Sequence, residues 1–342
     1  MARRILWASL VLTPVVLVAR FAFDAGATTL FLLSAAALIP LAWLIGEATE
    51  HAAEYTGPGI GGFLNASFGN APELIIALFA IADGLPLVVR GSITGSVVSN
   101  LLLVLGAAMI AGGRGRLDAR SITLQVGGLG AAVALLLVPS IPGWHGSPNR
   151  HTLMLVTIPV ALALLGFYLF LTIKNLRIHH ERERVEAAPH AWSFRAALVA
   201  LAIATVATAI VSETLVHSLT DFGHAVGLSE FFIAAVIVAI VGNAAEHGGA
   251  IVIARRGNTT LATEIAITSS LQVAVFVAPA VALLSLLFEH NLTLAFRPVE
   301  IATMAGATAV AWIVTRDGWS KRWEGFLLVV CYLGAVAAYW FS

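Results

Sequence analysis

Long apolar runs, separated by short polar stretches, follow one another along the whole chain. This pattern predicts membrane-spanning helices, because a helix that crosses a bilayer needs roughly 18 or more consecutive apolar residues. The short alternating segments typical of membrane barrels are missing. The expected fold is therefore an all-α polytopic membrane protein. We expect about eleven spans, at residues 5–22, 28–54, 60–82, 86–111, 121–141, 151–173, 194–217, 229–254, 259–285, 297–315 and 323–341.

The composition agrees with a chain surrounded by lipid. Of the 342 residues, 59% are hydrophobic and 11% are charged, which is less than half the charged share of a soluble domain. The formal net charge is zero, so nothing suggests a nucleic-acid partner. Cys331 is the single cysteine, which excludes a disulfide within the chain and a cysteine metal site. We interpret the apolar N-terminal run as a first span and not as a cleaved signal peptide.

The basic residues indicate how the chain crosses the membrane. With the N-terminus in the cytoplasm and the C-terminus outside, fifteen Lys and Arg residues fall inside and four fall outside, which follows the positive-inside rule. The inside set is Arg3, Arg4, Arg114, Arg116, Arg120, Lys174, Arg177, Arg182, Arg184, Arg195, Arg255, Arg256, Arg316, Lys321 and Arg322. The outside set is Arg20, Arg90, Arg150 and Arg297.

A hydrophilic stretch near the middle divides the spans into groups. We expect a leading helix at 1–27, a first five-helix repeat at 28–173, a cytoplasmic linker at 174–193 and a second five-helix repeat at 194–342. Five is odd, so the second repeat runs through the membrane in the opposite sense. Inverted repeats of this kind are common in secondary transporters, which place their sites near the midplane, where the repeats meet.

A short motif occurs once in each half. Gly69-Asn70-Ala71-Pro72-Glu73 is matched, 173 positions later, by Gly242-Asn243-Ala244-Ala245-Glu246. Other polar residues pair in the helices on either side of the motif. Those pairs are Glu47 with Glu213, His51 with His217, Ser96 with Thr268, and Asn100 with Gln272. Matching polar positions in three successive helices support an internal repeat and mark the candidate site.

The two motif carboxylates, Glu73 and Glu246, suggest the chemistry. A charged side chain at the bilayer centre costs about 2.5 to 3.5 kcal/mol, so such residues face the protein interior and have partners. We expect Glu73 and Glu246 to face each other across a cation. Two facing carboxylates cannot both be charged and empty, so either a metal neutralises them or they hold protons. A cation and protons then compete for the same oxygens, as an exchanger requires.

The ligand atoms available around this pair are all hard oxygens. They are supplied by Glu73 and Glu246, by the amides of Asn70, Asn243, Asn100 and Gln272, and by freed backbone carbonyls. Pro72 has no N–H, which leaves the Phe68 carbonyl without its helical donor, and Gly69 and Gly242 let another backbone come close. An all-oxygen set suits Ca²⁺ better than Mg²⁺ or Mn²⁺. Ca²⁺ and H⁺ are expected as transported ions, with no resident cofactor.

The motifs "GNAPELIIA" and "GNAAEHGGAI", followed by "SNLLLVLG" and "LQVAVFVAP", resemble those of the cation/proton exchanger (CAX) family. This family of Ca²⁺/H⁺ antiporters belongs to the wider Ca²⁺/cation antiporter superfamily. The resemblance covers essentially the whole chain. It implies a one-plus-five-plus-five fold, and Ca²⁺ bound between Glu73 and Glu246 with help from carbonyls around Gly69 and Gly242. It also implies polar gates on the second and seventh helices, which would place Glu47 and Glu213 there.

Six further polar residues have two interpretations each. Glu47, Glu213, His51, His217, Ser96 and Thr268 either gate the cavity and relay protons, or form structural hydrogen bonds between helices. The sequence does not choose between these roles. His247 carries the same ambiguity, because a single histidine in a helix is often a structural residue.

The function expected from the sequence is export of cytoplasmic Ca²⁺ in exchange for protons, by a transporter and not an enzyme. One alternative is a Na⁺-coupled exchanger of the same superfamily; another is an antiporter for a different divalent or monovalent cation. A haem protein or a passive channel is a further alternative, while an H-E-x-x-H metalloprotease motif is missing. A prokaryotic plasma membrane is the expected location. The ion stoichiometry and the oligomeric state, including a homo-oligomer, stay open.

Overall fold

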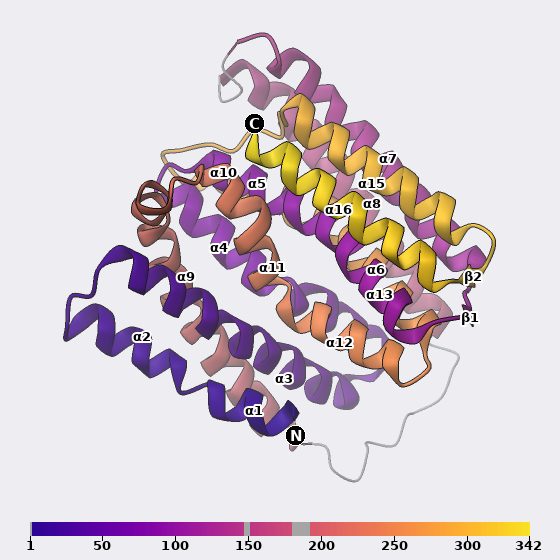
Figure 1. The fold of residues 1–342 in the computed structure, drawn as a ribbon, viewed down its shortest axis with the longest axis horizontal. Helices are drawn as coiled ribbons and strands as arrows, with labels where there is room; N and C mark the ends of the chain where they lie inside the picture. The colour runs from indigo at the N-terminus through magenta and orange to yellow at the C-terminus, as the bar shows by residue number, and fades with distance from the viewer. Residues whose placement is uncertain (1, 147–150, 180–191) are drawn as a thin grey trace. The chain divides into compact units, whose positions relative to one another are not determined.

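The computed structural model describes residues 2–146, 151–179 and 192–342, and in these ranges it is almost entirely helical (Figure 1). Most of the expected linker, at 174–193, lies outside the described residues. The chain forms two compact units that interleave along the sequence. The first contains Met1–Phe79, Gly166–Gly227 and Val241–Ala245, and the second contains Ala80–Leu165, Leu228–Ile240 and Glu246–Ser342. The predicted repeat boundaries differ from these units and stay a prediction.

The first unit is built around a long helix packed on a second one. Its complete helices are α1 (Ala2–Ser9), α2 (Leu12–Phe21), α3 (Ala27–Gly69) and α9 (Phe194–Val226). The aromatic rings of Phe31 on α3 and Phe222 on α9 stack with centroids 4.1 Å apart. Further along the same pair, Ile45 of α3 and Ala204 of α9 belong to one buried cluster. Apolar packing therefore joins these two helices at separate places along their lengths.

The second unit contains the remaining complete elements. Its helices and strands are α5 (Pro86–Val98), η1 (Ser99–Val104), α6 (Leu105–Gly112), β1 (Gly115–Arg116), α7 (Ala119–Gly143), η2 (His151–Leu153), α10 (Glu230–Phe232), η3 (Ile233–Val238), α13 (Thr259–Gln272), η4 (Val273–Val277), α14 (Ala278–Leu284), η5 (Ser285–Leu287), α15 (Pro298–Thr315), β2 (Trp319–Ser320) and α16 (Arg322–Trp340). Four helices belong to both units: α4 (Ala71–Ala82), α8 (Met154–His179), α11 (Ala239–Gly242) and α12 (Ala244–Arg255).

Glycines bring helices of the second unit very close together. A Cβ on Gly95 of α5 would lie 2.0 Å from the carbonyl oxygen of Ala235 in η3. A Cβ on Gly106 of α6 would lie 2.8 Å from the carbonyl oxygen of Gly325 in α16. No real side chain fits at such distances, so these contacts require glycine. Small residues at helix contacts are typical of packing inside membranes.

The helices confirm the predicted class of an integral membrane protein, but not the number of spans. In the described ranges nine helices are long and apolar enough to cross a membrane, and a tenth span results if Glu230–Gly242 and Ala244–Arg255, bent by 58°, count as one. The count of eleven is therefore not confirmed.

The predicted boundary between residues 54 and 60 is wrong. The α3 backbone stays helical through this stretch and ends at Gly69, so the span expected at 60–82 is divided between the end of α3 and the short helix α4. Gly57 and Pro58 lie in this stretch, and membrane helices tolerate both residue types. The interruption occurs instead at Asn70, inside the repeated motif.

Candidate cation site

Both copies of the motif interrupt a helix at the asparagine. Asn70 separates α3 from α4, and Asn243 separates α11 from α12. Asn70 has φ −93° and ψ 11°, which is not helical, and its N–H bonds to the carbonyl of Phe68. Pro72 has no N–H to donate to the Phe68 carbonyl four residues earlier, and the N–H of Asn70 bonds to that carbonyl in its place. Pro72 lies in the first turn of α4, where its missing N–H costs little.

Each interruption places a motif carboxylate in the first turn of a new helix. Glu73 lies in the first turn of α4, and Glu246 lies in the first turn of α12. The partial positive charge at a helix N-terminus stabilises a carboxylate there, which offsets part of the cost of burying it. Both glutamates thus share a position at a helix N-terminus.

In the first unit, Glu73 lies among buried polar and glycine residues. Glu73 is 7% exposed, and the asparagines Asn70 and Asn243 are 1% and 2% exposed. A Cβ on Gly242 would lie 3.5 Å from Oε1 of Glu73, so the end of α11 passes directly beside this carboxylate. Three of the predicted ligand residues, and the glycine expected to allow a close approach, are therefore brought together.

In the second unit, a chain of hydrogen bonds leads to Glu246. Asn100 of η1 donates from Nδ2 to Oγ of Ser269, at 3.2 Å, and the Ser269 hydroxyl donates to Oε2 of Glu246. Nε2 of His247 lies 2.9 Å from Oδ1 of Asn100. Because that amide oxygen only accepts, Nε2 of His247 carries the proton. In this series of hydrogen bonds, every donor is directed toward the Glu246 carboxylate.

The two half-sites differ, and the sequence analysis missed one reason. Ser269 follows the predicted residue Thr268 by one position, and the repeat-related position in the first half is Val97, which has no hydroxyl. Glu246 is also only partly buried, whereas Glu73 is fully buried. The polar run "TSSLQ" was a signal for Ser269, but its spacing alone does not say which hydroxyl meets the carboxylate.

The paired positions Ser96 and Thr268 have different surroundings. The Thr268 hydroxyl donates to Oε1 of Gln125 on α7, at 2.7 Å, and so points away from the Glu246 chain of hydrogen bonds. Ser96 is buried on α5, and its carbonyl accepts from the hydroxyl of Ser99. Gln272 ends α13 immediately before the π-helical turn η4. Asn100 lies within the π-helical turn η1, and turns of this type are frequent at functional sites.

The predicted gating glutamates have unlike partners in the first unit. Glu213 of α9 forms an ion pair with Arg20 of α2, whose Nη1 lies 3.1 Å from Oε2 of Glu213. The same nitrogen donates to the hydroxyl of Thr214 at 2.8 Å. Glu47 of α3 instead lies 3.6 Å from Nε2 of His51, one helical turn away. His217 is exposed on α9.

A buried ionic cluster lies in the second unit, where the sequence indicated only outside arginines. Glu300 of α15 is fully buried, and its Oε1 lies 2.9 Å from Nε of Arg297. The Arg297 guanidinium also lies over the ring of Phe231, 3.9 Å from the centroid. Arg90 of α5 is 2% exposed and acts electrostatically on Glu300. Buried charges inside a membrane protein need such partners.

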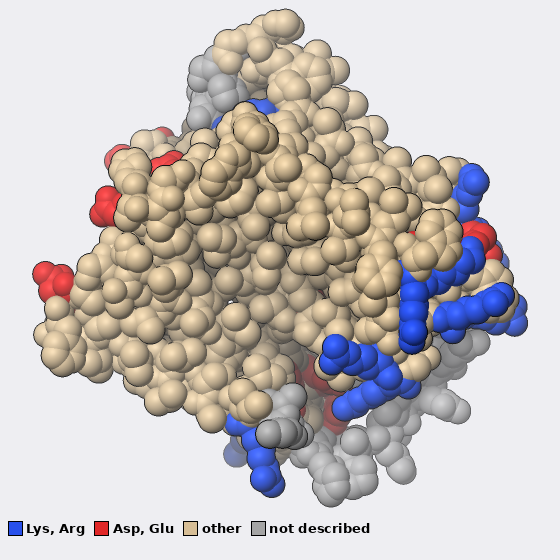
Figure 2. Space-filling view, in the orientation of Figure 1, with Lys and Arg blue, Asp and Glu red and all other residues tan. Residues whose placement is uncertain are grey.

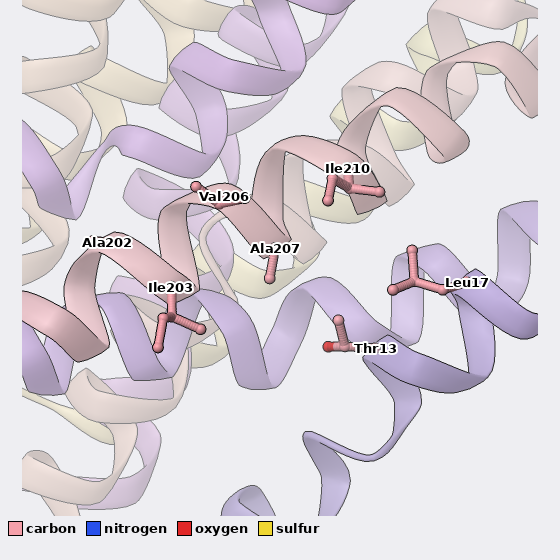
Figure 3. Close-up of a pocket in the computed structure, with 7 residues that line it drawn as sticks. All are labelled: Thr13, Leu17, Ala202, Ile203, Val206, Ala207 and Ile210. Carbon is pink, nitrogen blue, oxygen red and sulfur yellow. The ribbon is translucent and has the colours of Figure 1, made fainter.

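The described residues contain no group of three or more His, Cys, Asp or Glu side chains that could hold a metal ion. An apolar groove in the first unit, of about 380 Å³, has no carboxylate and is not a cation site (Figure 3). Its lining residues are Thr13, Leu17, Ala202, Ile203, Val206, Ala207 and Ile210.

Known proteins match this chain over most of its length. The family described as "sodium/calcium exchanger protein" matches residues 26–176 and 196–341. The Ca²⁺/H⁺ antiporter ChaA of Bacillus subtilis is 36% identical over 89% of this chain and 90% of its own length. The Ca²⁺/H⁺ antiporter of Aphanothece halophytica is 33% identical over 92% of this chain and 90% of its own length.

Solved structures agree as well. The structure of native YfkE has a TM-score of 0.86 at 30% identity and covers both chains completely. A second structure of YfkE, named there as a Ca²⁺/H⁺ antiporter protein, has a TM-score of 0.84 at 32% identity and covers 99% of this chain. The resemblance found from the two motifs is thereby confirmed.

Proposed function

The chain belongs to the sodium/calcium exchanger protein family, and from this premise we propose that it is a Ca²⁺/H⁺ antiporter. The observation that carries the proposal is the pair of interrupted helices. Each one starts again at a Gly-Asn-Ala-x-Glu motif, and each places a carboxylate in the first turn of the new helix. Relatives that span most of the chain are named Ca²⁺/H⁺ antiporters, which supports Ca²⁺ and H⁺ as the exchanged ions.

The proposed site unites the two half-sites. Ca²⁺ would bind to Glu73 and Glu246, with oxygens from Asn70, Asn243 and Asn100 completing the coordination. Hard carboxylate and amide oxygens are the ligands that Ca²⁺ prefers, and its flexible coordination accepts half-sites of unequal composition. Gln272 and the backbone around Gly69 and Gly242 are the remaining proposed sources of oxygen atoms.

Exchange would follow from competition at these two carboxylates. Without a metal ion, two facing carboxylates in a membrane hold protons, and an incoming Ca²⁺ displaces them. In alternating access, the site opens to one side of the membrane and then to the other. If this change occurs only when the carboxylates are neutralised, Ca²⁺ moves in one direction and protons move in the other. The chain would use the proton gradient to export Ca²⁺ from the cytoplasm of a prokaryotic cell.

The helix arrangement proposed for this cycle is a leading helix followed by two inverted five-helix repeats. The split of the family match into 26–176 and 196–341 supports two repeats divided near the expected linker. The excess of basic residues on one side supports a cytoplasmic N-terminus. Glu47 and Glu213, with His51, His217, Ser96 and Thr268, are proposed to control access or to relay protons.

The experiment that tests this function is Ca²⁺ uptake into proteoliposomes under an imposed gradient of one ion at a time. A pH gradient without Na⁺ is expected to drive uptake, and dissipating that gradient is expected to stop it. Uptake that occurs only when a Na⁺ gradient replaces the pH gradient would assign the chain to Na⁺-coupled exchange. Uptake that needs neither gradient would indicate a channel.

A further inference from the structure

Three loops of the second unit are joined into one surface. β1, between α6 and α7, pairs with β2, between α15 and α16, and the pairing aligns Gly115 with Ser320. The Ser320 hydroxyl donates to the carbonyl of Gly113 at 2.9 Å. The hydroxyl of Thr260, at the start of α13, donates to the carbonyl of Arg116 at 2.7 Å. The loop between α12 and α13 is therefore tied to the other two.

This surface carries a dense group of exposed arginines, which we call the arginine plate. It consists of Arg114, Arg116, Arg255, Arg256, Arg316 and Arg322. In Figure 2, basic side chains gather over the region of β1 and β2 and over the end of α12. Throughout the described ranges, none of the six forms an ion pair with a carboxylate.

Nearby acidic residues have other principal partners: Asp118 accepts from the N–H groups of Arg120 and Ser121, and Asp317, which also acts electrostatically on Arg316, is bonded to Lys321. Asp317 and Glu324 accept from Nζ of Lys321, at 2.5 and 3.0 Å. The hydrogen bond from Lys321 is the main cause that holds the pKa of Asp317 below its usual value, so this carboxylate stays charged with its own partner. The positive charge of the plate is therefore left to interact with groups outside the chain.

Tryptophans contact three arginines of the plate, and tryptophan favours the depth of lipid headgroups. The guanidinium groups of Arg114 and Arg116 lie over the ring of Trp319, 5.4 and 5.9 Å from its centroid. Arg316 lies over Trp312 in the same way, at 5.3 Å. Indole rings favour the membrane–water interface, and the candidate spans formed by α15 and α16 end on either side of this loop. Guanidinium groups held on these rings lie where lipid phosphates are found.

We propose that the arginine plate binds the phosphate groups of anionic phospholipids in the membrane leaflet that it faces. Guanidinium groups bind phosphate through paired hydrogen bonds, and basic clusters at the ends of spans attract anionic lipids. An alternative explanation for these arginines is that they interact with the partial negative charge at the end of a helix. This explains Arg255, which lies in the last turn of α12, but not Arg114, which lies in a loop. The hydrogen bonds between the loops hold several arginines on one surface. A general excess of basic residues on the cytoplasmic side would not require such a cluster.

The experiment compares lipids for their effect on thermal unfolding of the full chain in detergent. The probes are phosphatidylglycerol, phosphatidylcholine and glycerol 3-phosphate, which supplies the same phosphate without acyl chains. For the wild type, phosphatidylglycerol is expected to raise the unfolding midpoint well above the other two. An equal shift with phosphatidylcholine would overturn the proposal, and an equal shift with glycerol 3-phosphate would indicate a site for free phosphate instead of lipid.

The variant Arg114→Gln/Arg116→Gln/Arg316→Gln is expected to lose at least half of the shift that phosphatidylglycerol causes. The matched control, Arg4→Gln/Lys174→Gln/Arg195→Gln, removes three exposed basic residues of the first unit and is expected to keep it. If both triple variants lost the same part of the phosphatidylglycerol shift, general positive charge would explain the effect. That result would contradict binding at the arginine plate. Native mass spectrometry of Arg255→Gln/Arg256→Gln provides a second measurement, in which fewer retained phosphatidylglycerol molecules are expected and an unchanged number would count against the proposal.

Discussion

The backbone of Gly242 lies beside the carboxyl group of Glu73, so that a Cβ on Gly242 would be 3.5 Å from Oε1. The two residues belong to different copies of the repeated motif, yet both lie in the first compact unit. A structural contact between the two motif copies is what an internal repeat built around one site requires. A methyl group at Gly242 would be in ordinary contact with the Glu73 side chain, which makes the relationship testable.

Gly242→Ala is expected to keep Ca²⁺ transport, because 3.5 Å is an ordinary van der Waals contact. Gly242→Val is expected to abolish transport, because its methyl groups enter the space beside the Glu73 carboxylate where a cation would bind. The matched control is Gly249→Val on α12, where a Cβ would meet no atom within 4 Å. Proteoliposome uptake measures all three, and full activity of Gly242→Val would show that this space is not used.

Glu73→Gln and Glu246→Gln are each expected to reduce Ca²⁺ uptake to the level of empty liposomes. Glutamine keeps the size of the side chain but supplies neither the negative charge for Ca²⁺ nor a carried proton. Glu289→Gln, in an exposed loop, is the control and is expected to transport normally. Thermal unfolding should show all three variants folded, so that uptake by either motif variant would refute the role given to that carboxylate.

Ser269→Ala is expected to weaken the apparent affinity for Ca²⁺ by about tenfold. The Ser269 hydroxyl bonds to the Glu246 carboxylate, and a hydrogen bond to a charged group contributes about 1.5 to 3 kcal/mol. Ser270→Ala is the matched control, because this neighbouring hydroxyl bonds to the backbone carbonyls of Ala266 and Val97 and not to Glu246. The concentration dependence of uptake measures both, and equal effects in the two variants would mean that the contact with Glu246 has no special role.

Arg20→Gln and Glu213→Gln are expected to change the transport rate while changing stability little. Their ion pair is partly exposed, at 23% and 35%, and such pairs contribute about 0.2 to 1 kcal/mol to the free energy of unfolding. If opening the gate requires this pair to separate, the two substitutions should not act additively on the rate. A double-mutant cycle on initial uptake rates tests this, and additive effects would leave the pair a purely structural contact.

The fold class and the polar positions could be predicted from the sequence, because bilayer thickness and the cost of buried charge act on local segments. The duplicated motif predicted Asn70 and Asn243 as important, and the structure shows both helices interrupted there. Pro72 predicted a weakened helix beside Asn70, and α3 does end there, but the continuity of α3 through residues 54–60 was not predicted. The sequence analysis placed a boundary between residues 54 and 60, whereas the α3 backbone is helical there.

Contacts between distant segments account for what the sequence did not reveal. The bond from Ser269 to Glu246 joins two helices, and the ion pair of Arg20 with Glu213 joins residues 193 positions apart. Arg20 was interpreted from the charge distribution as an outside residue, a role that says nothing about its partner. Such pairs depend on how helices rotate and pack, which periodicity and spacing do not determine.

The central claim is that Ca²⁺ and protons compete for the carboxylates of Glu73 and Glu246. Release of protons on addition of Ca²⁺ to the purified protein, in weakly buffered detergent solution between about pH 5 and 8, tests it most directly. We predict that the wild type releases protons as Ca²⁺ binds, that either single Gln variant releases fewer, and that Glu73→Gln/Glu246→Gln releases none. Saturable Ca²⁺ binding without proton release across this pH range, or unchanged release by the double variant, would contradict the account.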